Sequence, residues 1–153
     1  MVMLHVVLVN PEIPHNTGAA GRLCLATGAR LHLVKPLGFS LDDRQVKRVG
    51  LDYWNDVDLQ VWENWEAFAG SVATDAGVHL LTTKTDHAYW DSAFKDGDYL
   101  VFGAETRGLP ESLLERHPER CLTIPMQEGS TRSLNLSTSV GIVLYEAVRQ
   151  LQS

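Results

Sequence analysis

Short apolar runs, rich in β-branched residues, recur along the chain and alternate with longer stretches typical of helices. The runs span residues 4–9, 30–34, 79–82, 99–102 and 122–124. The helical stretches span residues 17–27, 42–49, 62–72, 110–116 and 137–151, with Pro110 placed in the first turn of its helix. This alternation predicts an α/β fold, in which a mostly parallel sheet carries helices on both faces.

The length of 153 residues is typical of one domain, so residues 1–153 are expected to form a single unit. The first apolar run ends before Asn10-Pro11-Glu12, so it is too short to span a bilayer. No membrane partner is expected. Both cysteines, Cys24 and Cys121, lie in apolar surroundings. We interpret them as core thiols of a protein from the reducing cytoplasm.

The net charge of −6 argues against broad, non-specific binding of nucleic acid. The charge is uneven, because residues 1–50 hold six Lys and Arg against three acidic residues. A local basic patch on an acidic body would suit a partner that is met at one face only. The alternative is that residues 42–48 form an ordinary solvated helix face.

Ligands of open α/β sheets bind at the carboxyl ends of the strands, so the loops that follow strands are the informative ones. In the first loop, Asn16 and Thr17 are expected to cap the next helix, whose first amides would offer an anion site. Arg22 follows Asn16 by nearly two helical turns, so both side chains could point into one crevice. The alternative is a capped helix with a surface arginine.

The loop after residue 102 contains Gly103 and Gly108 at the spacing of a phosphate-binding P-loop, GxxxxG. The Lys and Ser/Thr that a P-loop requires are replaced by Leu109-Pro110, which argues against a nucleoside triphosphatase. A GxGxxG dinucleotide fingerprint is missing as well. The glycines still permit a tight loop that approaches a ligand closely, and the alternative is a purely structural turn.

Other familiar sites have little support. The six histidines are scattered, with no HxxxH or HExxH spacing, so no metal is expected. No GxSxG elbow is present, which argues against a serine hydrolase. The last loop, RSLNLS at residues 132–137, alternates like a strand but leads directly into an apolar helix.

Taken together, the loops resemble the three ordered motifs of the SPOUT RNA methyltransferases, over essentially the whole chain. The matching segments are Asn16-Thr17-Gly18 with Arg22, Gly103-x-Glu105-x-x-Gly108, and Ile124-Pro125-Met126 with RSLNLS. Within this superfamily the chain is similar to the short TrmL (YibK-type) tRNA 2′-O-methyltransferases. That narrower similarity lies in PEIPxNTG, LGF…DD…GLDY (residues 37–53), LTTK (residues 81–84) and YEA (residues 145–147).

The resemblance implies a fold that topology rules alone would reject, because the C-terminal segment of these enzymes forms a trefoil knot. It also implies a homodimer. RSLNLS would then belong to a threaded loop, where small side chains let backbones pass and Ser and Asn satisfy buried amides. The implied reaction transfers a methyl group from S-adenosylmethionine to the ribose 2′-hydroxyl of the wobble cytidine or uridine of leucine tRNAs. S-adenosylhomocysteine is the implied second product.

The resemblance also assigns roles to residues. The cofactor is expected against the backbone near Leu81, Gly103, Ile124 and Ser133, with Asn135 shaping the pocket. The candidates for catalysis are Arg22, Asn16 and Tyr145, although Tyr145 could instead be a packed interface residue. Glu105 and Gly108 would structure their loop, with Glu105 accepting amide hydrogen bonds. The tRNA backbone would meet Arg44, Lys47 and Arg48.

Arg22 is the family's candidate for activating the hydroxyl. Neutralising an arginine near pH 7 requires about six pKa units, or about 8 kcal/mol. A guanidinium that clamps the adjacent phosphate and stabilises the developing alkoxide is therefore the favoured interpretation over a free base. Gly21, which precedes it, departs from the family pattern and would allow close packing at a helix position where Gly costs about 1 kcal/mol relative to Ala.

Ala104 is a second departure, because the family often has Pro at that position. Two other functions stay open at this point. One is a catalytically silent dimer that binds cofactor or RNA. The other is a small-molecule α/β enzyme that binds a phosphate at the helix N-terminus near Thr17.

Overall fold

Six parallel strands form one sheet in the order β3-β2-β1-β5-β4-β6. The structure is a computed structural model, and it describes residues 3–42, 44, 46 and 51–152. The strands are β1 (His5–Val9), β2 (Arg30–Val34), β3 (Leu59–Trp62), β4 (Val78–Leu81), β5 (Tyr99–Phe102) and β6 (Cys121–Leu122). The central strands β1 and β5 are adjacent although about ninety residues separate them in the sequence.

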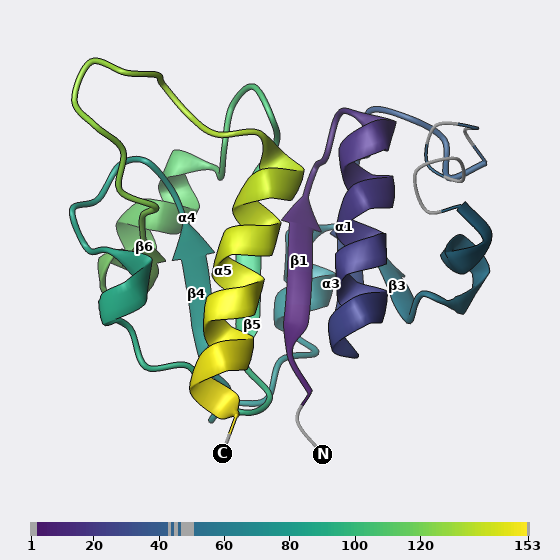
Figure 1. Cartoon of the computed structure of the whole chain (residues 1–153), viewed down its shortest axis with the longest axis horizontal. Helices are drawn as coiled ribbons and strands as arrows, with labels where there is room; N and C mark the ends of the chain where they lie inside the picture. Colours follow the sequence, from purple (N-terminus) through teal and green to yellow (C-terminus); the bar gives the residue numbers. More distant parts are fainter. Residues whose placement is uncertain (1–2, 43, 45, 47–50, 153) are drawn as a thin grey trace.

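Helices cover both faces of the sheet, as predicted. The α-helices are α1 (Pro14–Thr27), α3 (Trp65–Ala69), α4 (Glu111–Arg116) and α5 (Leu136–Leu151), and short 3₁₀ helices span Leu51–Asp56 (η1), Tyr89–Asp91 (η2) and Pro118–Arg120 (η3). Figure 1 shows α1 and α5 side by side in front of the sheet, with α3 and α4 behind it.

Each face of the sheet has its own core because side chains alternate along the strands. In β1, Val6 and Leu8 pack with the buried residues of α1 and α5. Val7 and Val9 join the other core, with Phe68 of α3. Cys24 and Cys121 are both buried, which confirms the prediction of core thiols, and burial raises the pKa of the Cys24 thiol to about 12.

The predicted helix over residues 62–72 is wrong in its first part. Residues 59–62 form the edge strand β3, and α3 begins only at Trp65. The side chain of Asn64 accepts a hydrogen bond from the amide of Ala67 and so caps α3. This cap sets the start of the helix after the strand has ended, and Trp62 serves as the last strand residue.

The predicted start of the first helix is also wrong. The helix α1 begins at Pro14, whose missing amide hydrogen suits the first turn, and Ile13 at the N-cap position makes no side-chain capping bond. Asn16 and Thr17 lie inside the helix and are buried, so neither caps it. The amide groups before Pro14 find their acceptor in another loop, described below.

Smaller differences affect the remaining predicted elements. Pro110 takes the N-cap position of α4 instead of its first turn. In the last loop, Asn135 caps α5: its side-chain oxygen accepts from the amide of Thr138 and from the hydroxyl of Ser137. The local use of Asn135 to satisfy a helix amide agrees with the prediction, whereas the Ser137 hydroxyl donates to Asn135 and does not bind an amide. The predicted helix over residues 42–49 falls largely outside the described residues.

Candidate active site

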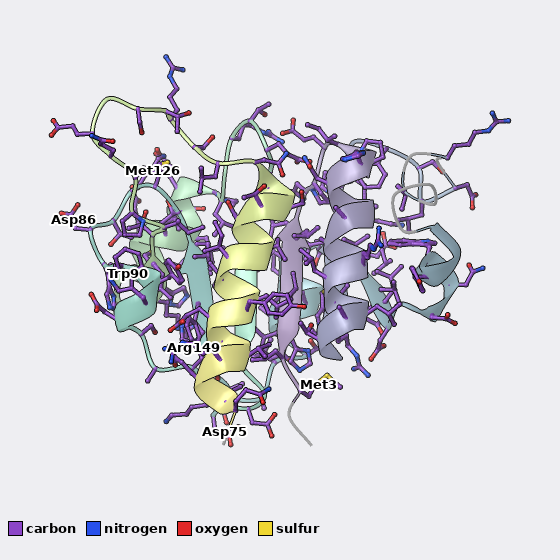
Figure 2. All side chains as sticks on the ribbon, viewed as in Figure 1. Met3, Asp75, Asp86, Trp90, Met126 and Arg149 are labelled. Atoms are coloured by element: carbon purple, nitrogen blue, oxygen red, sulfur yellow. The ribbon has the colours of Figure 1, made fainter. Side chains whose placement is uncertain are left out.

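A cavity of about 280 Å³ opens at the carboxyl edge of the sheet, between the loops that follow β4, β5 and β6. The four residues predicted to lie near the cofactor, Leu81, Gly103, Ile124 and Ser133, all line it. Its wall also includes Met126, which Figure 2 shows on the same flank of the molecule as Asp86 and Trp90. The loops after β4, β5 and β6 therefore meet in one cavity, as their positions in the sequence predicted, whereas the loop after β1 does not line it.

Two glycines that line this cavity, Gly103 and Gly108, determine the shape of the loop after β5. A Cβ atom on Gly103 would lie 2.1 Å from the carbonyl carbon of Gly108, so only glycine allows these two backbone segments to pass. Gly108 has φ +70°, a left-handed conformation that glycine adopts without strain. Its amide donates to the carbonyl of Ala104 at 2.8 Å and closes the loop. The loop-structuring role predicted for Gly108 fits this geometry.

Glu105, at the tip of the same loop, joins it to the start of α1. Its carboxylate accepts hydrogen bonds from the amides of Glu12 at 2.7 Å and Ile13 at 2.8 Å. These are the amides that have no local cap. The prediction that Glu105 accepts amide hydrogen bonds is confirmed, and the donors belong to the first loop.

Glu12 returns the interaction. Its carboxylate accepts from the amide of Thr106 at 2.8 Å and from the hydroxyl of Thr106 at 2.7 Å. The amide hydrogen bond, followed by that of the hydroxyl, lowers the pKa of the Glu12 carboxyl. The carboxylate of Glu105 thus binds the loop after β1, and the carboxylate of Glu12 binds the loop after β5.

The third loop is tied in through two amide side chains. The Asn16 side chain donates to the Glu105 carboxylate at 3.2 Å and accepts from the Asn135 side chain at 3.1 Å. Asn16 is only 3% exposed. Asn135 does not line the cavity, and its predicted role in shaping the pocket is therefore indirect. A continuous chain of hydrogen bonds connects all three motif loops.

Arg22 lies elsewhere in the single chain. It is exposed on α1, does not line the cavity, and its guanidinium carbon lies 5.8 Å from the centre of the Tyr53 ring. Within one chain, Asn16 and Arg22 therefore do not share a crevice, because six residues turn the helix by about 240°. Tyr145 is exposed on α5 and also lies outside the cavity.

Several cationic residues at the cavity were not predicted from the sequence. Lys84, Arg107 and Arg132 line it, and Lys84 pairs with Glu111. All three lie in loops that the motifs had singled out, so the signal was present but unassigned. Of the predicted basic patch, Arg44 is exposed, whereas Lys47 and Arg48 lie outside the described residues.

Metal ligands and membrane-spanning segments were also expected to be absent. In the part of the chain that the structure describes, no group of three or more His, Cys, Asp and Glu side chains could hold a metal ion. None of the helices there has the length and apolar character needed to cross a bilayer.

Comparisons with known proteins agree with this geometry. The model of the SpoU rRNA methylase family matches residues 3–145. A tRNA (cytidine(34)-2′-O)-methyltransferase from Burkholderia ambifaria is 51% identical over 150 residues, covering 97% of this chain and 96% of that protein.

Two solved structures extend the comparison. One, described as structural insights into the 2-OH methylation of C/U34 on tRNA, is 46% identical with a TM-score of 0.93, covering 98% of this chain and 97% of that one. The other, an AdoMet-bound rRNA methyltransferase from Sinorhizobium meliloti, is 27% identical with a TM-score of 0.86, covering 99% of this chain and 57% of that one.

Proposed function

This chain belongs to the SpoU rRNA methylase family, and from its similarity to the two tRNA relatives described above we propose that it methylates the ribose 2′-hydroxyl of the wobble pyrimidine, nucleotide 34, of tRNA. The observation that carries the proposal is the convergence of the second and third motif loops, together with the loop after β4, on one cavity. The substrates that we infer are leucine tRNAs with cytidine or uridine at that position. Residues 1–153 act as one domain, and the cytoplasm, where mature tRNA is used, is the proposed compartment.

The residues of the cavity fit S-adenosylmethionine. Leu81, Ile124 and Leu134 offer apolar surface for an adenine ring, and Gly103 lines the same cavity. Ser133 would contact the cofactor, while Asn135 holds its loop in place. When bound, the cofactor supplies an electrophilic methyl group and leaves as S-adenosylhomocysteine.

The protein must then place the 2′-hydroxyl in line and stabilise the charge that forms on its oxygen. Arg22 provides the stabilisation, because its guanidinium clamps the adjacent phosphate and offsets the charge of the alkoxide as the proton leaves to water. Asn16 cannot contact the ribose while its amide bridges Glu105 and Asn135, so it contributes by holding the loops together.

A homodimer would bring Arg22 of one subunit to the cavity of the other. Support comes from α1 and α5, which lie side by side at the front of the molecule in Figure 1. Arg22 of α1 and Tyr145 of α5 are both exposed. Tyr145 would contact RNA from this shared face. The C-terminal trefoil knot implied by the resemblance is part of the same proposal. In its favour, the chain leaves the edge strand β6 and returns to the middle of the sheet as α5.

The test is a methyl-transfer assay with labelled S-adenosylmethionine and unmodified leucine tRNA transcripts. We expect label on the ribose of nucleotide 34, and no label when that nucleotide carries a 2′-deoxyribose. Label on a base, or at another nucleotide, would contradict the proposal. Binding of cofactor and tRNA without transfer would favour the silent dimer instead.

Arg22→Lys should retain part of the activity and Arg22→Ala almost none. Full activity of Arg22→Ala would remove Arg22 from the mechanism. If Arg44, Lys47 and Arg48 bind the tRNA backbone, the affinity for tRNA should fall steeply with added salt despite the acidic net charge.

A further inference from the structure

Arg22 interacts with an aromatic ring. The guanidinium carbon lies 5.8 Å from the centre of the Tyr53 ring, within the range of a cation–π interaction. No ion pair of Arg22 is found among the described residues. Tyr53 belongs to η1 and is 47% exposed, so its ring stands at the surface beside α1.

Neighbouring residues fix the position of this ring. Gly21 precedes Arg22, and a Cβ atom on Gly21 would lie 2.7 Å from the Trp54 ring. Without that Cβ, Trp54 lies directly against the helix and packs on the core of the front face. Because Tyr53 is bonded to Trp54, the Gly21–Trp54 contact holds Tyr53 next to Arg22.

An aromatic partner and a carboxylate partner differ in whether the N–H donors of the arginine stay available for other ligands. A carboxylate would bind the fork of guanidinium N–H groups and compete with an RNA phosphate. A ring attracts the cation through its π face and accepts none of the five N–H donors in a conventional hydrogen bond. Arg22 is thus restrained while its donors and its charge stay available.

We propose that Tyr53 is a positioning residue for Arg22: its ring preorganises the guanidinium for the phosphate and the alkoxide. This proposal rests on the methyltransferase function proposed above. It assigns a role to the Tyr53 ring and none to its hydroxyl. It also explains why glycine at position 21 is useful in this chain despite its cost in a helix.

The test compares Tyr53→Leu, which removes the ring, with Tyr53→Phe, which keeps it. Single-turnover methylation with saturating tRNA and cofactor should fall about two- to fivefold in Tyr53→Leu, the range of an exposed cation–π interaction. Tyr53→Phe should stay within about twofold of the parent, and the Kd for S-adenosylmethionine should not change in either variant. Trp90→Leu removes an exposed aromatic side chain far from α1 and should change neither quantity.

A double-mutant cycle separates positioning from direct contact with RNA. If Tyr53 acts through Arg22, Tyr53→Leu should cause no further loss in the Arg22→Ala background. An equal loss in both backgrounds would overturn the proposal and indicate that Tyr53 itself stacks on RNA. A loss in Tyr53→Phe as large as in Tyr53→Leu would also overturn it, because the hydroxyl would then be the active group.

A readout without activity distinguishes failure of this proposal from failure of the proposed function. In NMR spectra of the full chain, the ring current of Tyr53 should shift the δ-methylene protons of Arg22 upfield. Tyr53→Phe should keep this shift and Tyr53→Leu should lose it. If the shift follows the ring but Arg22→Ala is fully active, the proposed function of Arg22 fails while the pairing stands. If the shift is the same in all three proteins, the pairing itself fails.

Discussion

Two groups of hydrogen-bonded side chains inside this molecule are built in different ways. At the carboxyl edge of the sheet, Glu105, Asn16 and Asn135 join three loops that are far apart in the sequence. On the back face, His5, His32 and Trp62 are joined along three neighbouring strands. The first group holds loops around a cavity, and the second satisfies polar atoms within a core.

The chemistry of the two groups differs accordingly. The indole N–H of Trp62 can only donate, so the Nδ1 atom of His32 accepts it at 3.0 Å. The neutral His32 ring then carries its proton on Nε2, which donates to Nδ1 of His5 at 2.9 Å. This group needs uncharged rings, whereas the loop group depends on a charged carboxylate. We therefore expect mutations in the loop group to affect cofactor binding, and changes in the histidine group to affect stability alone.

The largest effect is expected from Gly103→Ala. The new Cβ atom would overlap the backbone at Gly108, so we expect a loss of about 3 kcal/mol in the free energy of unfolding. Binding of S-adenosylmethionine, measured by calorimetry, should be lost with the shape of the loop. Gly28→Ala is a control with open space around a φ of +73°, and should cost about 1 kcal/mol without affecting binding. Wild-type-like binding by Gly103→Ala would contradict the close backbone passage.

The second largest effect is expected from Glu105→Ala. It leaves the amides of Glu12 and Ile13 without their acceptor and should lower the free energy of unfolding by about 2 kcal/mol. The loops around the cavity loosen, so kcat/KM should fall about thirtyfold, which is equivalent to the same 2 kcal/mol. Glu105→Gln keeps one oxygen acceptor, so its stability and its kcat/KM should lie between those of the wild type and Glu105→Ala. If stability falls but kcat/KM does not, Glu105 serves the fold alone.

The histidine group predicts a comparable effect of pH on stability. Burial, followed by the neighbouring His5 and Arg30, lowers the pKa of His32 to about 3, while Asp58 opposes this. Below the unfolded pKa of 6.5 the unfolded chain binds protons that the folded His32 does not. Its contribution is complete above pH 6.5 and is lost as the pH falls toward 3.

At pH 5 we expect His32 to reduce the free energy of unfolding by about 2 kcal/mol relative to pH 7, measured by urea denaturation. In His32→Phe this dependence should be weaker, and kcat at neutral pH should be unchanged. A variant that lost cofactor binding would show that the two groups are not independent.

The smallest effect concerns the bond between Asn16 and Asn135. A double-mutant cycle with alanine at each position should give a coupling energy of about 1 kcal/mol, the value of one neutral hydrogen bond. The same cycle performed on cofactor affinity should give coupling of the same sign. A coupling near zero in both would mean that the third loop is held by other contacts.

The difference between the two groups also explains what the sequence could predict. Leu81, Gly103, Ile124 and Ser133 line the cavity, as the family resemblance implied. The strands that lead to these loops were visible as local apolar runs. The start of α1 was predicted wrongly. The two amides just before it, those of Glu12 and Ile13, are bonded to Glu105, about ninety residues away, and no local signal encodes that partner.

The edge strand β3 was missed for a related reason. Its four residues, Leu59–Trp62, are mostly half-buried at the border of the sheet, so they lack the continuous apolar run of the central strands. The partner of Arg22 was missed as well. Tyr53 belongs to the GLDY segment, which the resemblance had singled out. The ring of Tyr53 lies beside α1 only because its neighbour Trp54 packs on Gly21.

The strand order has a consequence for synthesis on the ribosome. The middle strand β1 is made first, yet one of its two neighbours, β5, emerges only when residues 99–102 have been translated. Until then a nascent chain exposes the unpaired backbone of β1 on that side, an edge that other chains can join. Glu105 follows three residues after β5. Pairing of the central strand and the hydrogen bonds to Glu105 from the two amides before α1 therefore become possible almost together.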